Sequence, residues 1–338
     1  MNATTINAPR TSFMRKLAWD PLIWLILGIV ILGSLTSPYY LTLQNFDTLM
    51  RSMAVIGLLA LGVTVVLLTG RIDLSVAAIM IFSVILAVVL TNAVGEALGL
   101  RWLVKGSTFV GSSWIFVALT ILIGGLAGLV NGIGVAWLKV SSFIMTLVML
   151  TALRGGNFIL SSGRPYYLQT PAIDWIGTAT IFGVPFSFWV FLAVLVFLAW
   201  LIGATTFGRR IYAVGGNEKA AAYAGLKTDR YVLIAFVISG LCSAIAGVIF
   251  TARLRSVDAP LASGYELTAI AIAVIGGTAL SGGIGSPWRT LLGAMAFAGG
   301  LNLLSIWGIG TWYQNLAVGL ALLVAVGLSP ASRQKIRL

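Results

Sequence analysis

The sequence contains no histidine, a single cysteine and few charged residues, since Asp, Glu, Lys and Arg together make up 9% of its 338 residues. A soluble domain carries about 25% charge. Without histidine and with Cys242 alone, the chain has neither a Cys/His metal site nor a disulfide bond within itself. The same absences remove the Ser/His and Cys/His pairs used in nucleophilic catalysis, so no catalytic residue is predicted.

Hydrophobic residues make up 59% of the chain, and its mean hydropathy is +1.03. One soluble core cannot enclose so much apolar surface, so the lipid bilayer is the expected environment. We predict an all-α fold, a polytopic transmembrane helical bundle of about ten helices, with residues 1–338 as a single domain. Each apolar run comes close to the roughly 20 residues that a spanning helix needs. The runs are 21–35, 53–69, 76–92, 114–138, 143–160, 184–203, 231–251, 267–280, 288–307 and 313–328.

The net charge of +12 comes from basic residues in short clusters between these runs. Such placement favours cytoplasmic juxtamembrane positions over a nucleic-acid interface, so no nucleic-acid partner is expected. With ten spans and a cytoplasmic N-terminus, most lysines and arginines lie inside, whereas the opposite orientation places most of them outside. We therefore expect both termini to be cytoplasmic, with external loops at 91–113 and 161–185. The largest cytoplasmic segment is then about 204–230.

Small and polar residues mark several positions within the runs. Gly124, Gly128 and Gly132 recur every four residues, and this stripe favours close helix packing. Polar groups inside a membrane need partners and often line water-filled paths. The candidate path residues are Asn131, Phe143, Thr146 and Asn302. Asn157 either faces the path as well or is paired inside the bundle.

The few charged residues near the runs have structural explanations. Asp73, with Ser75, is expected to cap the helix that follows, and Glu266 to stabilise a helix N-terminus. Arg154 is a basic residue well inside a run, so it lies near the outer surface or faces a polar cavity. The segments 69–72 and 281–284 each separate two apolar runs and resemble one another, which either indicates an internal repeat or arises by chance.

The cytoplasmic segment is predicted to contain a short helix near 217–224. Gly215 and Gly216 permit a turn, Asn217 is a good N-cap, and Gly225 suits a left-handed C-terminal cap. Its alanines form a smooth face that suits a groove on another protein better than a lipid surface. The residues assigned to this contact are Gly208, Arg209, Arg210, Gly215, Gly216, Asn217, Glu218, Ala220, Ala221, Ala224 and Gly225.

Over nearly its whole length the chain resembles the permease subunits of ribose-type ABC sugar importers, which are related to branched-chain amino-acid permeases. The resemblance extends over several motifs in the order that the family shows. The motifs are 68–76, 128–132, 143–147, 208–226, 264–271, 275–278 and 281–286. Two departures stand out, because the family usually has Gly at Arg71 and Pro at Ser141 and Ser142.

The resemblance implies a permease subunit of an importer for a small polar solute, with a monosaccharide favoured. It implies a second permease copy or homologue, an ABC ATPase and an extracytoplasmic substrate-binding protein, in a bacterial inner membrane. The chain has no phosphate loop, so no cofactor is expected on it, and ATP and Mg would bind the partner ATPase. Segment 208–226 corresponds to the family's coupling region.

Other functions stay open at this stage. An ion- or proton-coupled secondary transporter usually needs carboxylates or histidines within the membrane, and every acid here can be placed near a helix end. An ABC permease for nucleosides or branched-chain amino acids is the nearer alternative.

Overall fold

The computed structural model describes residues 21–97, 104–105, 108–109, 113–168 and 170–327. The helices are α2 (Pro21–Thr36), α3 (Leu43–Leu68), α4 (Val76–Ala97), α5 (Ser113–Ala136), α6 (Ser142–Ser161), α7 (Pro171–Thr178), α8 (Phe186–Ala204), α9 (Thr206–Gly216), α10 (Glu218–Tyr223), α11 (Thr228–Leu254), α12 (Tyr265–Ile275), α13 (Pro287–Ile306) and α14 (Thr311–Gly327). The strands are β1 (Val104–Lys105), β2 (Thr108–Phe109), β3 (Tyr166–Leu168), β4 (Thr180–Ile181), β5 (Val184–Pro185) and β6 (Ser256–Val257).

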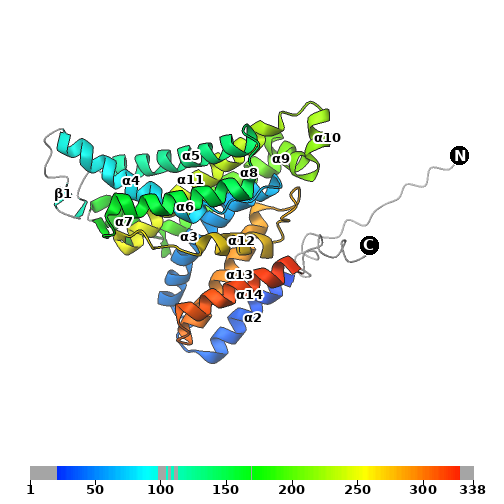
Figure 1. The fold of residues 1–338 in the computed structure, drawn as a ribbon. Helices are drawn as coiled ribbons and strands as arrows, with labels where there is room; N and C mark the ends of the chain where they lie inside the picture. Colours follow the sequence, from blue (N-terminus) through cyan, green and yellow to red (C-terminus); the bar gives the residue numbers. More distant parts are fainter. Residues whose placement is uncertain (1–20, 98–103, 106–107, 110–112, 169, 328–338) are drawn as a thin grey trace, which may run out of the picture.

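The long helices form two layers (Figure 1). One layer contains α4, α5, α6, α8 and α11, and the other contains α2, α13 and α14. Helices α3 and α12 connect them, since α3 packs on α8, α11, α12 and α13. The short helices α9 and α10 project at one end of the bundle, and β1 lies at the opposite end.

The described helices confirm a polytopic helical membrane protein. Seven of them are long and apolar enough to cross a bilayer: α3, α4, α5, α6, α8, α11 and α13. The other predicted runs fall on α2, α12 and α14. The eighth run was predicted too long, because α12 ends at Ile275 and Gly276 and Gly277 begin a loop. Conversely, α3 begins at Leu43, ten residues before the predicted start, because Thr42 caps it through the backbone N–H of Asn45.

Helix α3 is the centre of the molecule. Every residue from Met53 to Leu68 is buried, so the helix has no exposed face along this stretch. A helix that is apolar on all sides is expected in the core of a large bundle. The remaining helices are therefore arranged around α3.

The glycine stripe packs α5 closely against α11, as the sequence predicts. A Cβ on Gly124 would lie 2.7 Å from the carbonyl oxygen of Gly240, and one on Gly128 would lie 2.3 Å from that of Phe236. Side chains at these positions would force the backbones apart. The stripe is thus a packing surface inside one chain.

The strands are short additions to the helical bundle. Four of them form a sheet in the order β1-β2-β3-β6, and β4 pairs with β5. The four-stranded sheet connects the segments that follow α4, α6 and α11, at the end of the bundle away from α10. Parts of the two predicted long loops are therefore ordered by main-chain pairing.

Candidate functional site

A cavity with partly polar walls lies where one end of each of five helices comes together on the same side of the bundle. It has a volume of about 320 Å³ and is bounded by α3, α11, α12, α13 and α14. This end of the bundle is opposite α9 and α10, because α9 contacts the far end of α3. The polar residues in its wall are Thr48, Ser52, Arg253, Tyr265, Thr268, Asn302, Ser305, Thr311, Gln314 and Asn315. Small-molecule sites have volumes of about 300–1,000 Å³.

Hydrogen bonds hold several of these side chains in place. Asn302 and Asn45 form a reciprocal amide pair, with Nδ2 to Oδ1 distances of 2.7 and 3.1 Å. Arg253 donates to the hydroxyl of Ser52 at 2.9 Å, and Gln314 donates to that of Ser305 at 3.1 Å. The wall therefore offers amide, hydroxyl and guanidinium groups in fixed positions, which suits a solute with several hydroxyl groups.

Of the four predicted path residues, Asn302 lines this cavity. Asn131 and Thr146 are fully buried between helices, and Phe143 is half exposed on α6. Sequence reasoning missed Gln314 and Asn315, although both are polar residues inside a predicted apolar run. It could not find Ser52 or Thr48, which precede the predicted start of their helix.

Asn131 belongs to a buried hydrogen-bond network around Asp73. Its Nδ2 donates to the hydroxyl of Ser75 at 2.8 Å, and that hydroxyl donates to Asp73 Oδ1 at 2.6 Å. The backbone N–H of Ser75 and the hydroxyl of Ser239 also donate to Asp73. Asp73 lies between the membrane-spanning helices α3 and α4, and burial raises the pKa of its carboxyl while these hydrogen bonds lower it. The network joins the α3–α4 loop to α5 and α11.

Arg154 forms an ion pair with Glu266 in the first turn of α12, with 2.8 Å between Nη2 and Oε1. The Arg154 side chain is 37% exposed. It also lines a small polar cavity with Asn157, whose Oδ1 is buried without a partner among the described residues. The ion pair explains how α6 tolerates a cation within a predicted span.

The segment 204–230 contains the two helices α9 and α10, and α11 begins at Thr228. Asn217 caps α10 as predicted, because its side chain accepts a hydrogen bond from the backbone N–H of Ala220. Gly225 has a left-handed φ of +83°, and the backbone N–H of Leu226 donates to the carbonyl of Ala221. These bonds close both ends of α10, which confirms the predicted caps.

Two expectations for this segment are wrong. Gly215 and Gly216 do not form a turn, because they are the last residues of the additional helix α9. A Cβ on Gly215 would lie 1.8 Å from the carbonyl oxygen of Leu68, so this glycine lets α9 touch the end of α3. Ala221 faces the protein and is 6% exposed, whereas Ala220, Ala222 and Ala224 are exposed. The surface offered by α10 therefore excludes Ala221.

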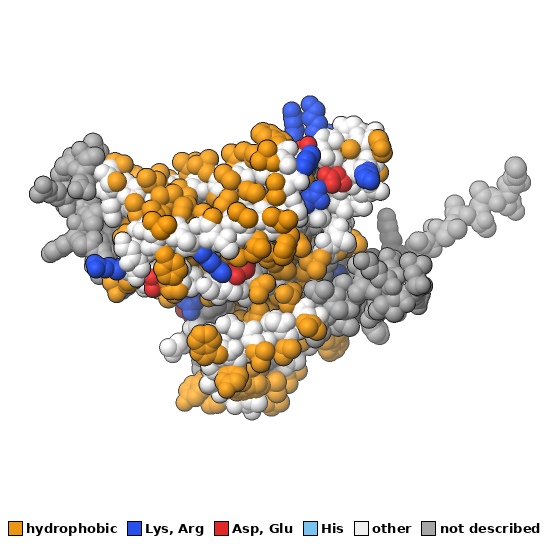
Figure 2. All heavy atoms as spheres, viewed as in Figure 1, with side chains coloured by type: hydrophobic (Ala, Val, Ile, Leu, Met, Phe, Trp, Pro, Cys, Tyr) orange, Lys and Arg blue, Asp and Glu red, His pale blue; other side chains and the backbone are white. Residues whose placement is uncertain are grey.

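Positive charge surrounds the α9–α10 end of the molecule. Figure 2 shows Lys and Arg side chains gathered there, while hydrophobic side chains cover most of the long helices. Arg209 and Arg210 are exposed on α9, and Lys219 is exposed on α10. Gly208 is buried, and a Cβ there would lie 1.8 Å from the carbonyl oxygen of Ile202. An exposed basic surface next to a short helix is compatible with a cytoplasmic contact.

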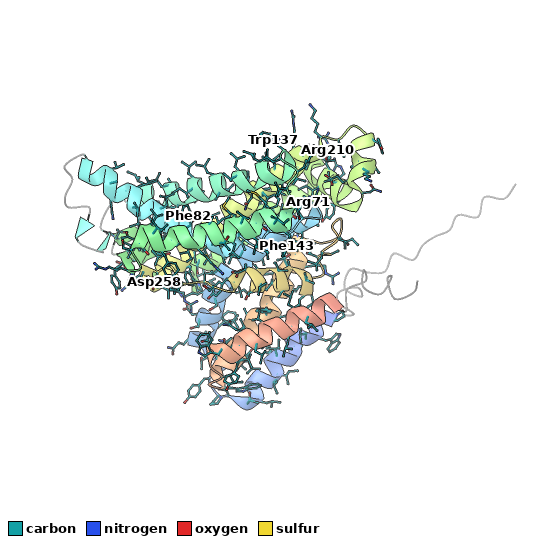
Figure 3. The ribbon with its side chains drawn as sticks, viewed as in Figure 1. Arg71, Phe82, Trp137, Phe143, Arg210 and Asp258 are labelled. Carbon is teal, nitrogen blue, oxygen red and sulfur yellow. The ribbon has the colours of Figure 1, made fainter. Side chains whose placement is uncertain are left out.

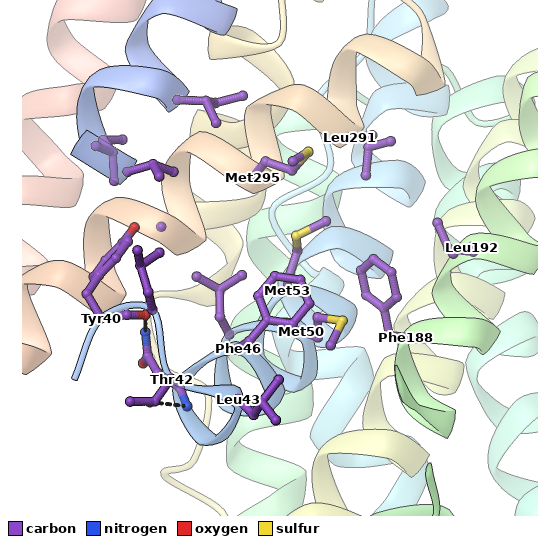
Figure 4. Close-up of a pocket in the computed structure, with 17 residues that line it drawn as sticks. Tyr40, Thr42, Leu43, Phe46, Met50, Met53, Phe188, Leu192, Leu291 and Met295 are labelled. Carbon is purple, nitrogen blue, oxygen red and sulfur yellow. Dashed lines mark hydrogen bonds between the residues drawn. The ribbon is translucent and has the colours of Figure 1, made fainter. Parts of the chain in front are cut away.

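A larger cavity, of about 560 Å³, has a different character. It lies between α2, α3, α8 and α13, and its walls are almost entirely apolar. Figure 4 shows Met50, Met53, Phe188 and Met295 around it. Such walls offer few partners to a hydroxylated solute, so the smaller polar cavity is the better candidate site.

Comparisons with known proteins show the family of this chain. The family model described as "Branched-chain amino acid transport system / permease component" matches residues 45–326. The ribose import permease protein RbsC of Haemophilus influenzae is 34% identical over 302 residues, which cover 88% of each chain. RbsC of Bacillus subtilis is 36% identical over 304 residues, again 88% of each chain.

An arabinose permease is similar as well. The L-arabinose transport system permease protein AraH of Escherichia coli is 34% identical over 322 residues, covering 95% of this chain and 93% of AraH. No solved structure is significantly similar to this chain. Because the family model covers most of the chain and these relatives match nearly end to end, the protein belongs to the permease-component family of ABC importers, whose members are transport subunits and not enzymes.

Proposed function

We propose that this chain is the membrane-spanning subunit of an ATP-driven importer that moves a monosaccharide into the cytoplasm, with pentoses the first solutes to test. Relatives named for ribose and L-arabinose match it over nearly its whole length. The polar cavity carries the proposal, because its amides and hydroxyls suit a sugar and it lies at the end opposite α10. The solute enters there and leaves at the end where α9 and α10 project.

The proposed assembly contains two permease chains, either two copies of this one or this one and a homologue. An ABC ATPase with ATP and Mg binds at the α10 end, and an extracytoplasmic binding protein delivers sugar to the other end. The location is a bacterial inner membrane, with ten spans and both termini cytoplasmic. The exposed basic residues Arg209, Arg210 and Lys219 at the α10 end support this orientation through the positive-inside rule.

The test uses this chain assembled in proteoliposomes with candidate ABC ATPase and binding-protein partners from the same organism. We expect uptake of labelled ribose or arabinose that requires ATP and the loaded binding protein. Asn315→Leu removes an amide from the cavity wall and should lower uptake about three- to tenfold, the effect of one hydrogen bond. Leu316→Ala changes an exposed neighbour that does not line the cavity and should leave uptake unchanged.

Two results would contradict the proposal. Uptake driven by an ion or proton gradient without ATP would identify a secondary transporter. Normal uptake by Asn315→Leu and by a second cavity variant, Tyr265→Leu, would show that the solute does not pass through this cavity. Stimulation of the ATPase by a panel of loaded binding proteins then identifies the solute, with nucleosides and branched-chain amino acids included.

A further inference from the structure

The loop of residues 69–75, between α3 and α4, contacts both the α9–α10 unit and the membrane-spanning bundle. Gly70 has a left-handed φ of +75°, which turns the chain away from the end of α3. In Figure 3 Arg71 lies at the end of the molecule where Phe143 of α6 and Arg210 of α9 also lie. The contacts of this loop fall into two groups, one on each side.

On the outer side, the loop is bonded to α10. Arg71 Nη2 lies 2.8 Å from Glu218 Oε2, and the two side chains are 30% and 39% exposed. Next to this ion pair, α9 packs its Gly215 against the last carbonyl of α3. The backbone N–H of Gly283 also donates to Leu68, and the hydroxyl of Tyr212 in α9 donates to the carbonyl of Gly285. The two similar segments 69–72 and 281–284 therefore meet at the C-terminal end of α9.

On the inner side, the same loop is bonded to three helices of the bundle. Asp73 accepts a hydrogen bond from Ser239 of α11 at 2.8 Å. Through Ser75 it is connected to Asn131 of α5. The backbone N–H of Ile72 donates to the hydroxyl of Ser142, the first residue of α6, at 3.3 Å.

The contacts on the two sides of the loop differ in how much free energy is needed to break them. Asp73, Ser75, Asn131 and Ser239 are fully buried, so breaking their hydrogen bonds leaves unpaired polar groups and a buried carboxylate. The Arg71–Glu218 pair is partly exposed to solvent, which screens it. The Arg71–Glu218 pair is therefore the weaker attachment of the loop, and the buried network around Asp73 is the stronger one.

We propose that the loop 69–75 carries movement of α10 into the membrane-spanning helices, with Arg71 as the positioning residue that receives it from Glu218. This inference rests on the proposed function, because it takes α10 to be the contact with the ATPase. An ATP-driven change at α10 can bias the permease between two states only through contacts that differ between those states. The Arg71–Glu218 pair connects two elements that are far apart in sequence, and the proposal requires that this pair differ between the two states.

The experiment compares Arg71→Gln, Glu218→Gln and the double variant in the reconstituted transporter with its ATPase and binding protein. We expect the ATPase to co-elute with all three, and the solute moved per ATP hydrolysed to fall about fivefold in each single variant. The double variant should be no worse than either single one, because both remove the same interaction. The exchange Arg71→Glu with Glu218→Arg should restore most of the coupling.

Lys139→Gln is the matched control. It removes an exposed ion pair with Asp229 at 2.5 Å, and Asp229 lies in the first turn of α11, just beyond α10. Transport per ATP should be unchanged in this variant. Losses that add in the double variant, no rescue on exchange, or full coupling in both single variants would each overturn the inference.

A further pair of variants separates this inference from the proposed function. Ala224→Arg places a large charge on the exposed face of α10 and should detach the ATPase, whereas Ser263→Arg, exposed and remote from α10, should not. If Ala224→Arg leaves the ATPase bound, the contact at α10 is wrong and the inference fails with it. If Ala224→Arg detaches the ATPase but Arg71 and Glu218 act independently, only the inference fails.

Discussion

Arg71, Ser141 and Ser142 are the positions at which the sequence is expected to depart from ribose-type permeases, and two of them, Arg71 and Ser142, have partners around one loop. Arg71 pairs with Glu218, and the hydroxyl of Ser142 accepts a hydrogen bond from the backbone N–H of Ile72. Neither glycine at the first position nor proline at the second has a side chain that can form these bonds. The departures therefore strengthen the attachment of the loop 69–75 in this protein.

Gly128 provides a test of packing at the scale of one residue. Gly128→Ala puts a methyl group 2.3 Å from the carbonyl oxygen of Phe236, and overpacking of this kind costs about 1–3 kcal/mol. We expect a lower apparent Tm in detergent and weaker contact between α5 and α11. Gly155→Ala is the control, because no atom lies within 4 Å of its added Cβ and alanine favours a helix by about 0.5–1 kcal/mol. A Tm for Gly128→Ala equal to that of Gly155→Ala would contradict the packing role.

At the scale of an element, α10 has few residues and depends on its caps. Its six residues are too few for a helix that is stable on its own. The side chain of Asn217 satisfies one backbone N–H, Gly225 ends the helix, and the buried Ala221 anchors it to the protein. The caps and Ala221 therefore fix the backbone of α10, while its outer face stays exposed.

Asn217→Ala should therefore loosen α10 more than the rest of the protein. Loss of an N-cap costs about 1 kcal/mol, so amide hydrogen exchange in 218–224 should accelerate about fivefold. Asn217→Ser keeps an oxygen that can accept the same bond and should exchange nearly as slowly as the parent chain. Acceleration spread equally over α9 and α11, or equal in both variants, would show that the cap does not control α10.

At the scale of the whole molecule, the two ends of the bundle differ in chemistry. One end presents α9, α10 and exposed basic side chains. The other end presents the polar cavity, β-strand pairs and the Arg51–Asp47 and Arg255–Asp174 ion pairs. The proposed solute path connects these ends, and α3 with its buried surface extends between them.

The orientation of these ends is open to direct measurement. A reporter fused after Leu338 should read cytoplasmic, because ten predicted spans return the chain to its starting side, and one fused after Ala224 should read cytoplasmic as well, because six predicted spans precede it. A reporter inserted in 163–170 should read external. Of the predicted spans after Ala224, α12 and α14 are not among the seven long apolar helices. An external reading after Leu338 together with a cytoplasmic one after Ala224 would therefore mean that one predicted span after Ala224 does not cross.

Much of the helical architecture could be predicted from the sequence. Apolar runs mark helices because backbone polar groups in lipid must bond within their own segment. The glycine stripe and the caps of α10 could also be predicted, since both follow from local spacing and local backbone geometry. The family that the motifs resemble agrees with the family model and the curated relatives.

The sequence alone could not reveal what the tertiary structure brings together. Arg71 and Glu218 are far apart along the chain, and so are Asp73 and Ser239, so their pairing depends on how α9 and α11 pack around α3. The polar cavity likewise combines polar residues from five helices, and none of these residues forms a recognisable motif within its own helix. The sequence by itself determined where the helices lie along the chain, because hydrophobic patterning is a local property. Only the packing of the helices in the tertiary structure decided which polar groups come into contact.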